Sequence, residues 1–328
     1  MNALNKPDRL PDNRPLAGVL WMALAGMMFV AMTATVKYMG SGLPPAQAAF
    51  LRYLLGLVFV LPFLPALVRH WPSRSDWTLF SLRGLVHSIA VILWFYAMTR
   101  ITLAEVTAMQ YLTPIYVTLG AALFLGEKLR ARRLVAVLFA LIGALIMLRP
   151  GFRELSPGHL AMLGMAVLMG VSYLLTKGLT RRHDATTVVT VLSVTVTIGL
   201  APFALPVWVP VSMTELAWLF LVAFFATAGH YAITRALSAA PISVTQPVVA
   251  LQLVWAVALG ALLFGEGVDL FVVLGGSVIA ASVIFIALRE QAGRRAAARL
   301  AAGTEAGATA GTGAVHPDAP PPRPGAAP

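Results

Sequence analysis

The stretch FLGEKLRARR at residues 124–133 returns in altered form as LFGEGVDLFV at residues 263–272. Both copies carry apolar residues followed by Gly and Glu, but only the first is followed by a burst of Lys and Arg. Sliding the sequence by 139 residues places Glu127 on Glu266. Because positive charge selects one side of a membrane, this pattern predicts one membrane unit present twice, in opposite orientations.

The composition is that of a chain surrounded mainly by lipid. Hydrophobic residues make up 59% of the sequence, charged residues only 11%, and the mean hydropathy is +0.82. These polar residues are too few to cover a water-soluble globule of 328 residues. The net charge of +11 comes largely from basic residues between apolar runs, which indicates membrane orientation and not nucleic-acid binding. The absence of Cys excludes disulfides and thiolate chemistry.

Ten apolar stretches approach or reach the length that crosses a bilayer. The predicted fold is therefore an all-α polytopic membrane protein with ten transmembrane helices, arranged as two inverted five-helix repeats. The expected spans are residues 16–38, 45–67, 77–98, 102–125, 134–148, 159–179, 186–207, 215–237, 243–264 and 270–288.

The loop charges predict the orientation of the chain. Sixteen Lys and Arg lie in the segments on one side of these spans, and only Arg100, Arg149 and Arg153 lie on the other. The positive-inside rule then places both termini in the cytoplasm and the protein in the cell inner membrane. The expected domains are a cytoplasmic segment (1–15), two five-helix repeats (16–148 and 159–288) and a cytoplasmic tail (289–328), largely disordered from about residue 301.

Three motifs resemble a known family: AFLRYLLG (49–56), AEVTAMQYLTPIYVTLGAALFLGEKL (104–129) and SVTQPVVALQLVWAVALGALLFGE (243–266). Together with the five-plus-five layout they are similar to the EamA type of the drug/metabolite transporter superfamily. The resemblance implies a ten-helix bundle with a central cavity lined by helices 1, 3, 4, 6, 8 and 9. It also implies small organic cargo such as amino acids, purines, vitamins or drugs. One departure is Leu253, which stands where the fourth helix has Pro114.

The third expected helix carries the most informative polar residues. Arg83, His87 and Trp94 lie within about 40° of one another on one helical face. A cation, an imidazole and an aromatic ring on one face are typical of a substrate or proton path. The alternative for His87 is a hydrogen bond to a neighbouring helix. The segment SLRGLVHSIAVILWFYAM (81–98) around them is similar to a branch of the family that includes S-adenosylmethionine and riboflavin carriers.

Further substrate-binding candidates lie on helices 4, 6, 8 and 9 of the predicted bundle. They are Gln110, Tyr111, Tyr173, His230, Gln252 and Trp255. Amide and aromatic groups together suit a planar or amphipathic organic solute. The alternative is that the Gln side chains bond only across helix interfaces.

Arg52 and Glu105 are candidates for an ion pair or a gate, since charged groups inside spans are costly. For Lys37 and Lys177, snorkelling to the interface and substrate contact are both open. For Glu127 and Glu266 we expect a role in fixing the turn or bonding the facing half of the protein.

The sequence predicts a secondary active transporter of a small organic metabolite that works by alternating access. It contains no phosphate-binding loop, HExxH or GxSxG motif, so we expect no catalytic residues, no cofactor, no metal and no enzyme activity. Arg52 and Arg83 favour an anionic or zwitterionic cargo, while proton coupling, exchange and a homodimer stay open. The rival classes are a membrane-embedded enzyme and a non-transporting scaffold.

Overall fold

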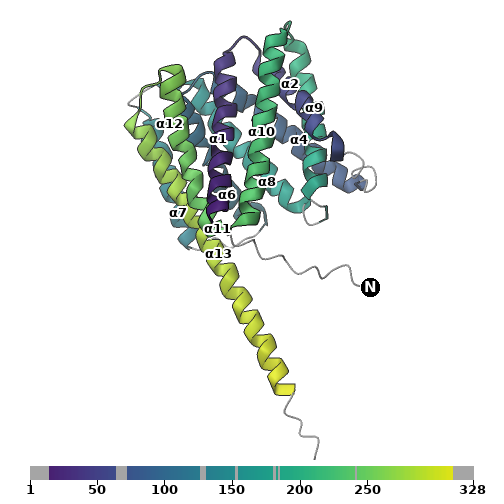
Figure 1. The fold of residues 1–328 in the computed structure, drawn as a ribbon, viewed down its shortest axis with the longest axis vertical. Coiled ribbons are helices and arrows are strands. Elements are labelled where there is room, and N and C mark those ends of the chain that lie inside the picture. Colours follow the sequence, from purple (N-terminus) through teal and green to yellow (C-terminus); the bar gives the residue numbers. More distant parts are fainter. Residues whose placement is uncertain are drawn as a thin grey trace, which may run out of the picture. The chain divides into compact units, whose positions relative to one another are not determined.

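A computed structural model describes most of the chain, which folds as two units. The described residues are 15–63, 72–125, 131–151, 154–179, 182–183, 185–240 and 242–312. One unit, residues 1–287, contains the helical bundle, and the other comprises residues 288–328. Across these described ranges the chain is helical and holds no strand (Figure 1).

Six helices have the length and apolar composition needed to cross a membrane. They are α1 (Pro15–Met39), α4 (Arg74–Met98), α8 (Pro157–Leu179), α9 (Ala185–Ala204), α10 (Met213–Ala239) and α13 (Leu270–Thr312). The other elements are α2 (Pro45–Gly56), η1 (Leu57–Phe59), η2 (Leu61–Phe63), α5 (Leu103–Gln110), α6 (Thr113–Leu125), α7 (Ala131–Leu148), η3 (Leu205–Val207), α11 (Ile242–Thr245), η4 (Gln246–Ala250) and α12 (Leu251–Phe264).

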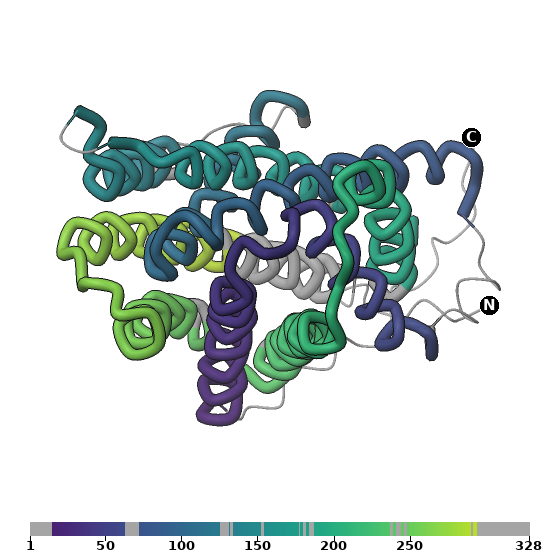
Figure 2. The backbone as a smooth tube through the Cα atoms, turned by 90° about the horizontal axis from the view of Figure 1, so that it is seen from above, coloured from purple at the N-terminus to yellow at the C-terminus, as the bar shows by residue number. Residues whose placement is uncertain are grey.

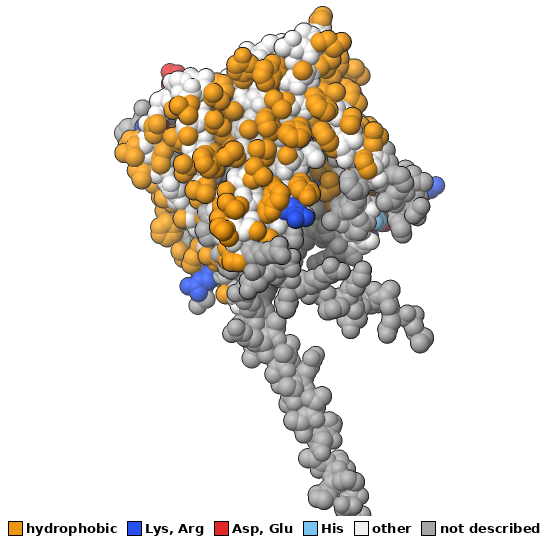
Figure 3. All heavy atoms as spheres, in the orientation of Figure 1, with side chains coloured by type: hydrophobic (Ala, Val, Ile, Leu, Met, Phe, Trp, Pro, Cys, Tyr) orange, Lys and Arg blue, Asp and Glu red, His pale blue; other side chains and the backbone are white. Residues whose placement is uncertain are grey.

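The side chains on the outside of the bundle are mainly apolar. Figure 3 shows hydrophobic side chains over most of the visible face, with charged groups only at its margins. Large apolar residues such as Phe124 and Leu262 are exposed. A contiguous apolar exterior of this extent matches a lipid environment, in which helices satisfy their own backbone hydrogen bonds.

The first and eighth predicted spans pack side by side in opposite directions. Near the start of α1, Gly18 lies against Ala236 and Ala240 at the end of α10. At the other end of the pair, Tyr38 stacks near Trp218, with ring centroids 5.2 Å apart. The two helices also run together in Figures 1 and 2. We call the end of the bundle where α1 ends the upper end, as in Figure 1, and the opposite end the lower end.

The helices α4 and α8 form a second extensive antiparallel pair. The tertiary contacts of the bundle also join α6 to α8, α12 to α1, α9 to both α2 and α4, and α2 to α10. Short distances between helices depend on small residues, since a Cβ on Gly84 of α4 would lie 2.7 Å from Thr195 of α9. The main apolar core lies where these helices meet.

Two of the predicted spans are interrupted within the bundle. The expected helix 102–125 consists of α5 and α6, separated by a tight turn in which Leu112 N–H donates to Met109 O at 3.1 Å. The expected helix 243–264 consists of α11, the 3-10 segment η4 and α12. Pro114 follows the first break and Pro247 lies within η4, and Pro removes a backbone donor from a helix.

Other predicted boundaries also differ from the structure. The expected second span begins as α2 but becomes 3-10 at Leu57, and its last residues lie outside the described ranges. The helix α13 continues to Thr312, so the expected end at 288 and the expected disorder from about 301 differ from what the structure shows. Its Ala-rich sequence RRAAARLAA is a strong helix former, which explains the extension. Glu127 and the side chain of Lys177 lie outside the described part.

The helices α7 and α13 approach at a pair of glycines. A Cβ on Gly143 would lie 2.7 Å from Gly275 O, and a Cβ on Gly275 would lie 2.9 Å from the backbone N of Met147. Any side chain at either position must therefore push the two backbones apart. Small residues are the usual means by which helices in lipid approach closely.

We predict that Gly275→Ala weakens this crossing. The added methyl group meets backbone atoms that cannot give way, and overpacking of this kind costs about 1–3 kcal/mol. The expected result is a lower free energy of unfolding in an SDS titration of the purified protein. The matched control is Gly178→Ala on α8, where no described atom lies within 4 Å of the added Cβ. Equal stability of the two variants would refute the close crossing.

Candidate functional site

A hydrogen-bonded relay joins three helices in the interior of the bundle. The Tyr53 hydroxyl of α2 lies 3.0 Å from His87 Nε2 of α4, and His87 Nδ1 lies 3.1 Å from Ser172 Oγ of α8. Both nitrogens of the imidazole therefore have partners from different helices. This relay fixes the orientation of the His87 ring, so any ligand that reaches His87 meets an oriented group.

Two arginines flank the relay. The Arg52 guanidinium lies over the Tyr53 ring, 4.1 Å from its centroid. Arg83 is buried and donates from Nη1 to Val188 O of α9 at 3.1 Å. The Nε atoms of both arginines are buried, and no described atom accepts a hydrogen bond from either. Each side chain thus keeps a donor for a further group.

The relay and the arginines lie deep in the bundle. Arg52 is seven residues after the start of α2, about 11 Å from the upper end at 1.5 Å per residue. Arg83 is nine residues after the start of α4, about 13 Å from the lower end. A cation at such depth costs roughly 2.5–3.5 kcal/mol on insertion scales, so the pair requires compensation.

The charge around His87 is one-sided. Among the described residues, the groups that act electrostatically on its ring are Arg83, Arg52 and His230 of α10, and none is an acid. Tyr173 of α8 lies within electrostatic range of Arg83. Tyr173 and His230 lie well inside their helices, and both side chains are exposed. We call Arg52, Tyr53, Arg83, His87, Ser172, Tyr173 and His230 the central cluster.

The remaining candidates lie mainly where α5 and α12 meet. Tyr111 follows α5 directly and donates from its hydroxyl to Val249 O at 3.0 Å, which bridges the two interrupted spans. Gln252 lies on α12 against Gly26 of α1, and Gln110 is partly buried at the end of α5.

Two of the predicted tryptophans keep a free indole donor. The Nε1 atoms of Trp94 and Trp255 are buried, and nothing in the described ranges accepts a hydrogen bond from them. Trp94 lies on α4, about two turns above His87, and Trp255 lies on α12. An orphaned donor inside a protein is costly unless a ligand or water satisfies it.

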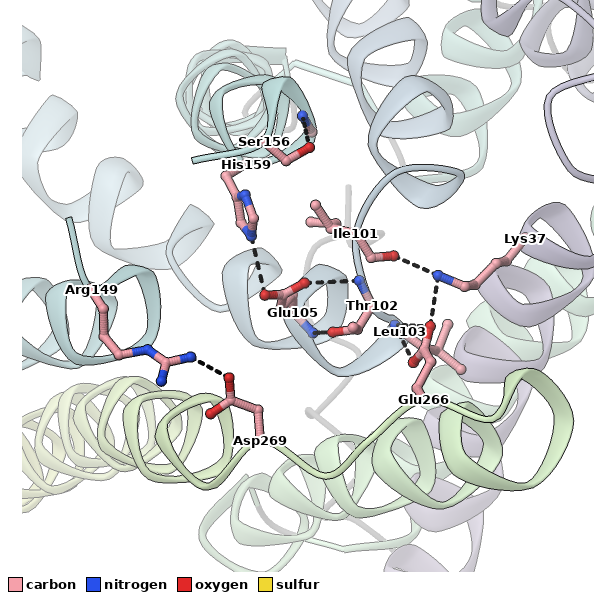
Figure 4. Close-up of polar contacts among 11 residues, drawn as sticks. Lys37, Ile101, Thr102, Leu103, Glu105, Arg149, Ser156, His159, Glu266 and Asp269 are labelled. Carbon is pink, nitrogen blue, oxygen red and sulfur yellow. Dashed lines mark hydrogen bonds and ion pairs between the residues drawn. The ribbon is translucent and has the colours of Figure 1, made fainter. Parts of the chain in front are cut away.

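A separate set of polar contacts lies at the upper end (Figure 4). Glu105 accepts from Thr102 N–H at 2.8 Å, which completes a capping box at the start of α5, and lies 3.1 Å from His159 Nε2 of α8. The expected pairing of Arg52 with Glu105 stays a prediction, since the contacts described here join each to other groups.

Two ion pairs lie beside this buried pair. Lys37 Nζ lies 2.6 Å from Glu266 Oε1, and Arg149 pairs with Asp269. The bond to Glu266 is one that snorkelling alone does not explain. Glu266 bonds to Lys37 and to the Leu103 amide, which agrees with the expectation that it bonds the facing half of the protein.

Sequence reasoning overlooked Tyr53, Ser172 and His159. Tyr53 and Ser172 each stand next to a residue that it did select, Arg52 and Tyr173, but helical periodicity places neighbours on different faces. Across the described ranges, no three His, Asp or Glu side chains come together in a way that could hold a metal ion.

A family model for EamA-like transporters matches the chain twice, over residues 16–149 and 156–288. The chain belongs to the EamA-like transporter family. The matched residues include the central cluster and all the upper contacts. Polar and charged groups inside the bundle of this EamA-like protein are therefore candidates for the transport path.

Curated relatives of this EamA-like protein carry transporter names. A riboflavin transporter of Vibrio cholerae is 30% identical over 281 residues, covering 84% of this chain and 94% of the relative. An S-adenosylmethionine uptake transporter of Rickettsia prowazekii is 23% identical, and a pseudopaline exporter of Pseudomonas aeruginosa is 26% identical. They cover 84% and 82% of this chain, and 94% and 95% of their own lengths. One solved structure matches with a TM-score of 0.51 and 20% identity over 84% of this chain and 96% of its own, which supports the fold alone.

We predict that Tyr53→Phe raises the reactivity of His87 toward diethyl pyrocarbonate. The change keeps the ring beneath Arg52 but removes the hydrogen bond to His87 Nε2. The net free energy of one hydrogen bond corresponds to about a twofold to tenfold rise in the fraction of His87 with a free Nε2. Peptide mass spectrometry of the purified protein measures the rate at His87, with His159 as the internal reference. The control variant is Tyr96→Phe. Tyr96 lies on α4, the helix of His87, but its ring contacts Arg100. An unchanged rate at His87 would show that the relay does not hold the imidazole.

Proposed function

We propose that this protein is a ten-span secondary transporter made of two inverted five-helix repeats that give alternating access to the central cluster. One observation carries the proposal: the third span of each proposed repeat begins at the same spacing as the Gly-Glu motifs, Glu127 and Glu266. Arg74 and Met213, which begin α4 and α10, are 139 residues apart.

Local structure follows the same spacing. Ser73 caps α4 by accepting from Asp76 N–H, and Ser212 caps α10 by accepting from Glu215 N–H. The break after α5 at Tyr111 and the end of η4 at Ala250 correspond as well. The prolines near the two breaks do not occupy corresponding positions, since Leu253 stands where the first repeat has Pro114. An interruption nevertheless occurs in both spans.

The packing pairs exchange under the same operation. If the first five spans map onto the second five, the pair α1 and α10 becomes the pair α8 and α4, which are the two most extensive helix contacts. The contact of α6 with α8 likewise becomes that of α12 with α1. A pseudo-twofold arrangement of this kind is the usual plan of secondary transporters with a site near the midplane.

The count of ten combines the six long helices, three shorter apolar helices and the interrupted pair α5 and α6. Five spans per repeat is an odd number, so the second repeat enters from the opposite side. Loop charge then favours cytoplasmic termini, an inner-membrane location and an upper end that faces outward.

For the cargo we propose a small organic solute with an anionic or acceptor-rich group. Arg52 and Arg83, each with a buried Nε that no described atom bonds, favour negative charge, while Tyr173 and the Trp94 indole favour a flat ring. The names of the relatives make riboflavin-like compounds the first candidates, with S-adenosylmethionine-like and opine-like compounds next. Proton coupling and exchange are both compatible with the two histidines. The rival proposal, a membrane enzyme or scaffold, lacks a supporting residue set.

We predict that the two Gly-Glu turns face opposite compartments. Because the natural chain lacks Cys, Lys128→Cys and Gly267→Cys each introduce a single thiol beside Glu127 and Glu266. A membrane-impermeant maleimide applied to intact cells should label Gly267→Cys and leave Lys128→Cys unlabelled until the cells are opened. Labelling of both from one compartment would remove the inverted repeat and the transport mechanism built on it.

We predict that the central cluster sets the apparent affinity for cargo. Riboflavin, S-adenosylmethionine, amino acids and nucleosides are first screened for stabilisation of the purified protein. For a compound that stabilises it, His87→Ala and Arg83→Gln should each weaken uptake into proteoliposomes about tenfold or more, the usual size for loss of a charge-assisted bond. The control is His159→Ala, which changes a buried histidine outside the cluster. Unchanged affinity and pH profile in His87→Ala would remove His87 from the path.

A further inference from the structure

Glu266 connects three segments at the upper end. Its carboxylate accepts from Leu103 N–H, the first residue of α5, at 2.9 Å and 3.3 Å. The same carboxylate lies 2.6 Å from Lys37 Nζ near the end of α1. Lys37 in turn donates to Ile101 O at 2.6 Å. Figure 4 shows the four groups converging beside the turn that follows α12.

The Gly-Glu turn is shaped to deliver this carboxylate. Gly265 has a φ of +62°, in the left-handed region, which ends α12 and reverses the chain. The reversed chain brings Glu266 back over the last turns of α12, and a Cβ on Gly260 would overlap Oε2 of Glu266. Gly265 turns the chain and Gly260 leaves room for the carboxylate, so together they position Glu266. This explains the Gly-Glu motif at the upper end.

The three ion pairs described at the upper end each cross between the two halves of the chain. Lys37 and Leu103 belong to the first half, whereas Glu266 belongs to the second. The pair of Glu105 with His159 and the pair of Arg149 with Asp269 cross in the same way. The side chains of Lys37 and Glu266 are only 17% and 12% exposed, so water competes little for their charges.

We propose that Lys37, Glu266 and the start of α5 form a latch that closes the upper end, and that its release opens the central cluster to the upper side. The inference rests on the proposed alternating access, because only a carrier needs this end to separate. Glu266 is the principal member, since it holds both Lys37 and the Leu103 amide. The loss of Glu266 leaves the Leu103 amide without its acceptor and Lys37 without its counter-charge, whereas the loss of Lys37 leaves the bond to Leu103 in place.

The lower end offers a matched contrast. Asp76, near the start of α4, pairs with Arg182 at 3.0 Å and with His183 at 3.2 Å, and these contacts also cross between halves. The Arg182 side chain is 61% exposed. A variant at Asp76 therefore breaks an inter-half ion pair without touching the upper end.

Release of the latch is measured by thiol labelling, which requires no cargo. The reporter is Tyr173→Cys in the central cluster, as the single Cys of the chain. Met213→Cys, at the upper start of α10, marks the outer compartment, and Leu16→Cys, at the lower start of α1, marks the inner one. An impermeant maleimide is added to intact cells, and the rate of reaction is followed by gel shift.

In the reporter background, Glu266→Ala, Lys37→Gln and Gly260→Ala remove the latch by three different means. We expect Glu266→Ala to raise the labelling rate from the upper side about tenfold, the factor that corresponds to roughly 1.4 kcal/mol. Lys37→Gln should give a smaller rise. Gly260→Ala should also raise the rate, although no charge changes. Asp76→Asn should give no rise.

The possible outcomes separate the latch from the proposed function. An unchanged labelling rate in all three variants, with the purified proteins still monodisperse, would overturn the latch. An equal rise in Asp76→Asn would also overturn it, because any lost ion pair would then have the same effect. A reporter that reacts from neither side in cells or in inverted vesicles, or markers that react from the same side, would instead overturn alternating access.

Discussion

Every backbone N–H and C=O group inside lipid needs a partner within the protein, and this constraint organises the whole bundle. Within a helix these groups bond to one another, so the backbone groups that still need partners lie at helix ends and breaks. Side chains supply some of these partners. Gln47 donates to Val209 O and accepts from Val209 N–H, and Tyr111 donates to Val249 O. Much of the polar chemistry at the ends of the bundle thus serves the backbone.

The central cluster stands out against that background. Among the described residues, only one of its contacts with other helices, that of Arg83 with Val188 O, supplies a backbone group, while Tyr53, His87 and Ser172 bond to one another. Two buried arginine Nε donors without a partner among the described residues are a poor way to stabilise a helix bundle in lipid. They are a good way to attract a negative solute into it. These polar groups without partners, more than any single residue, distinguish the candidate transport path from the rest of the bundle.

Helical periodicity sufficed to place Arg83 and His87 on one face of a helix, and the recurrence of Gly-Glu sufficed to suggest a duplicated unit. Periodicity could not supply the partners of His87, because Tyr53 and Ser172 approach it from helices far away in the sequence. Pro114 and Pro247 indicate bends in two spans, but periodicity did not show that the helix stops after α5 and changes to a 3-10 segment before α12. What depends on a single helix was predictable, and what depends on the meeting of three was not.

The glycine crossing of α7 and α13 limits how the halves of the bundle can move. With Gly143 and Gly275 almost backbone to backbone, any slide along the helix axis would bring Met147 or Ile279 into a gap that has no room for a side chain. Rotation about the point of crossing meets no such obstacle. In the proposed alternating access, this crossing would serve as a pivot about which one half rolls over the other with little translation.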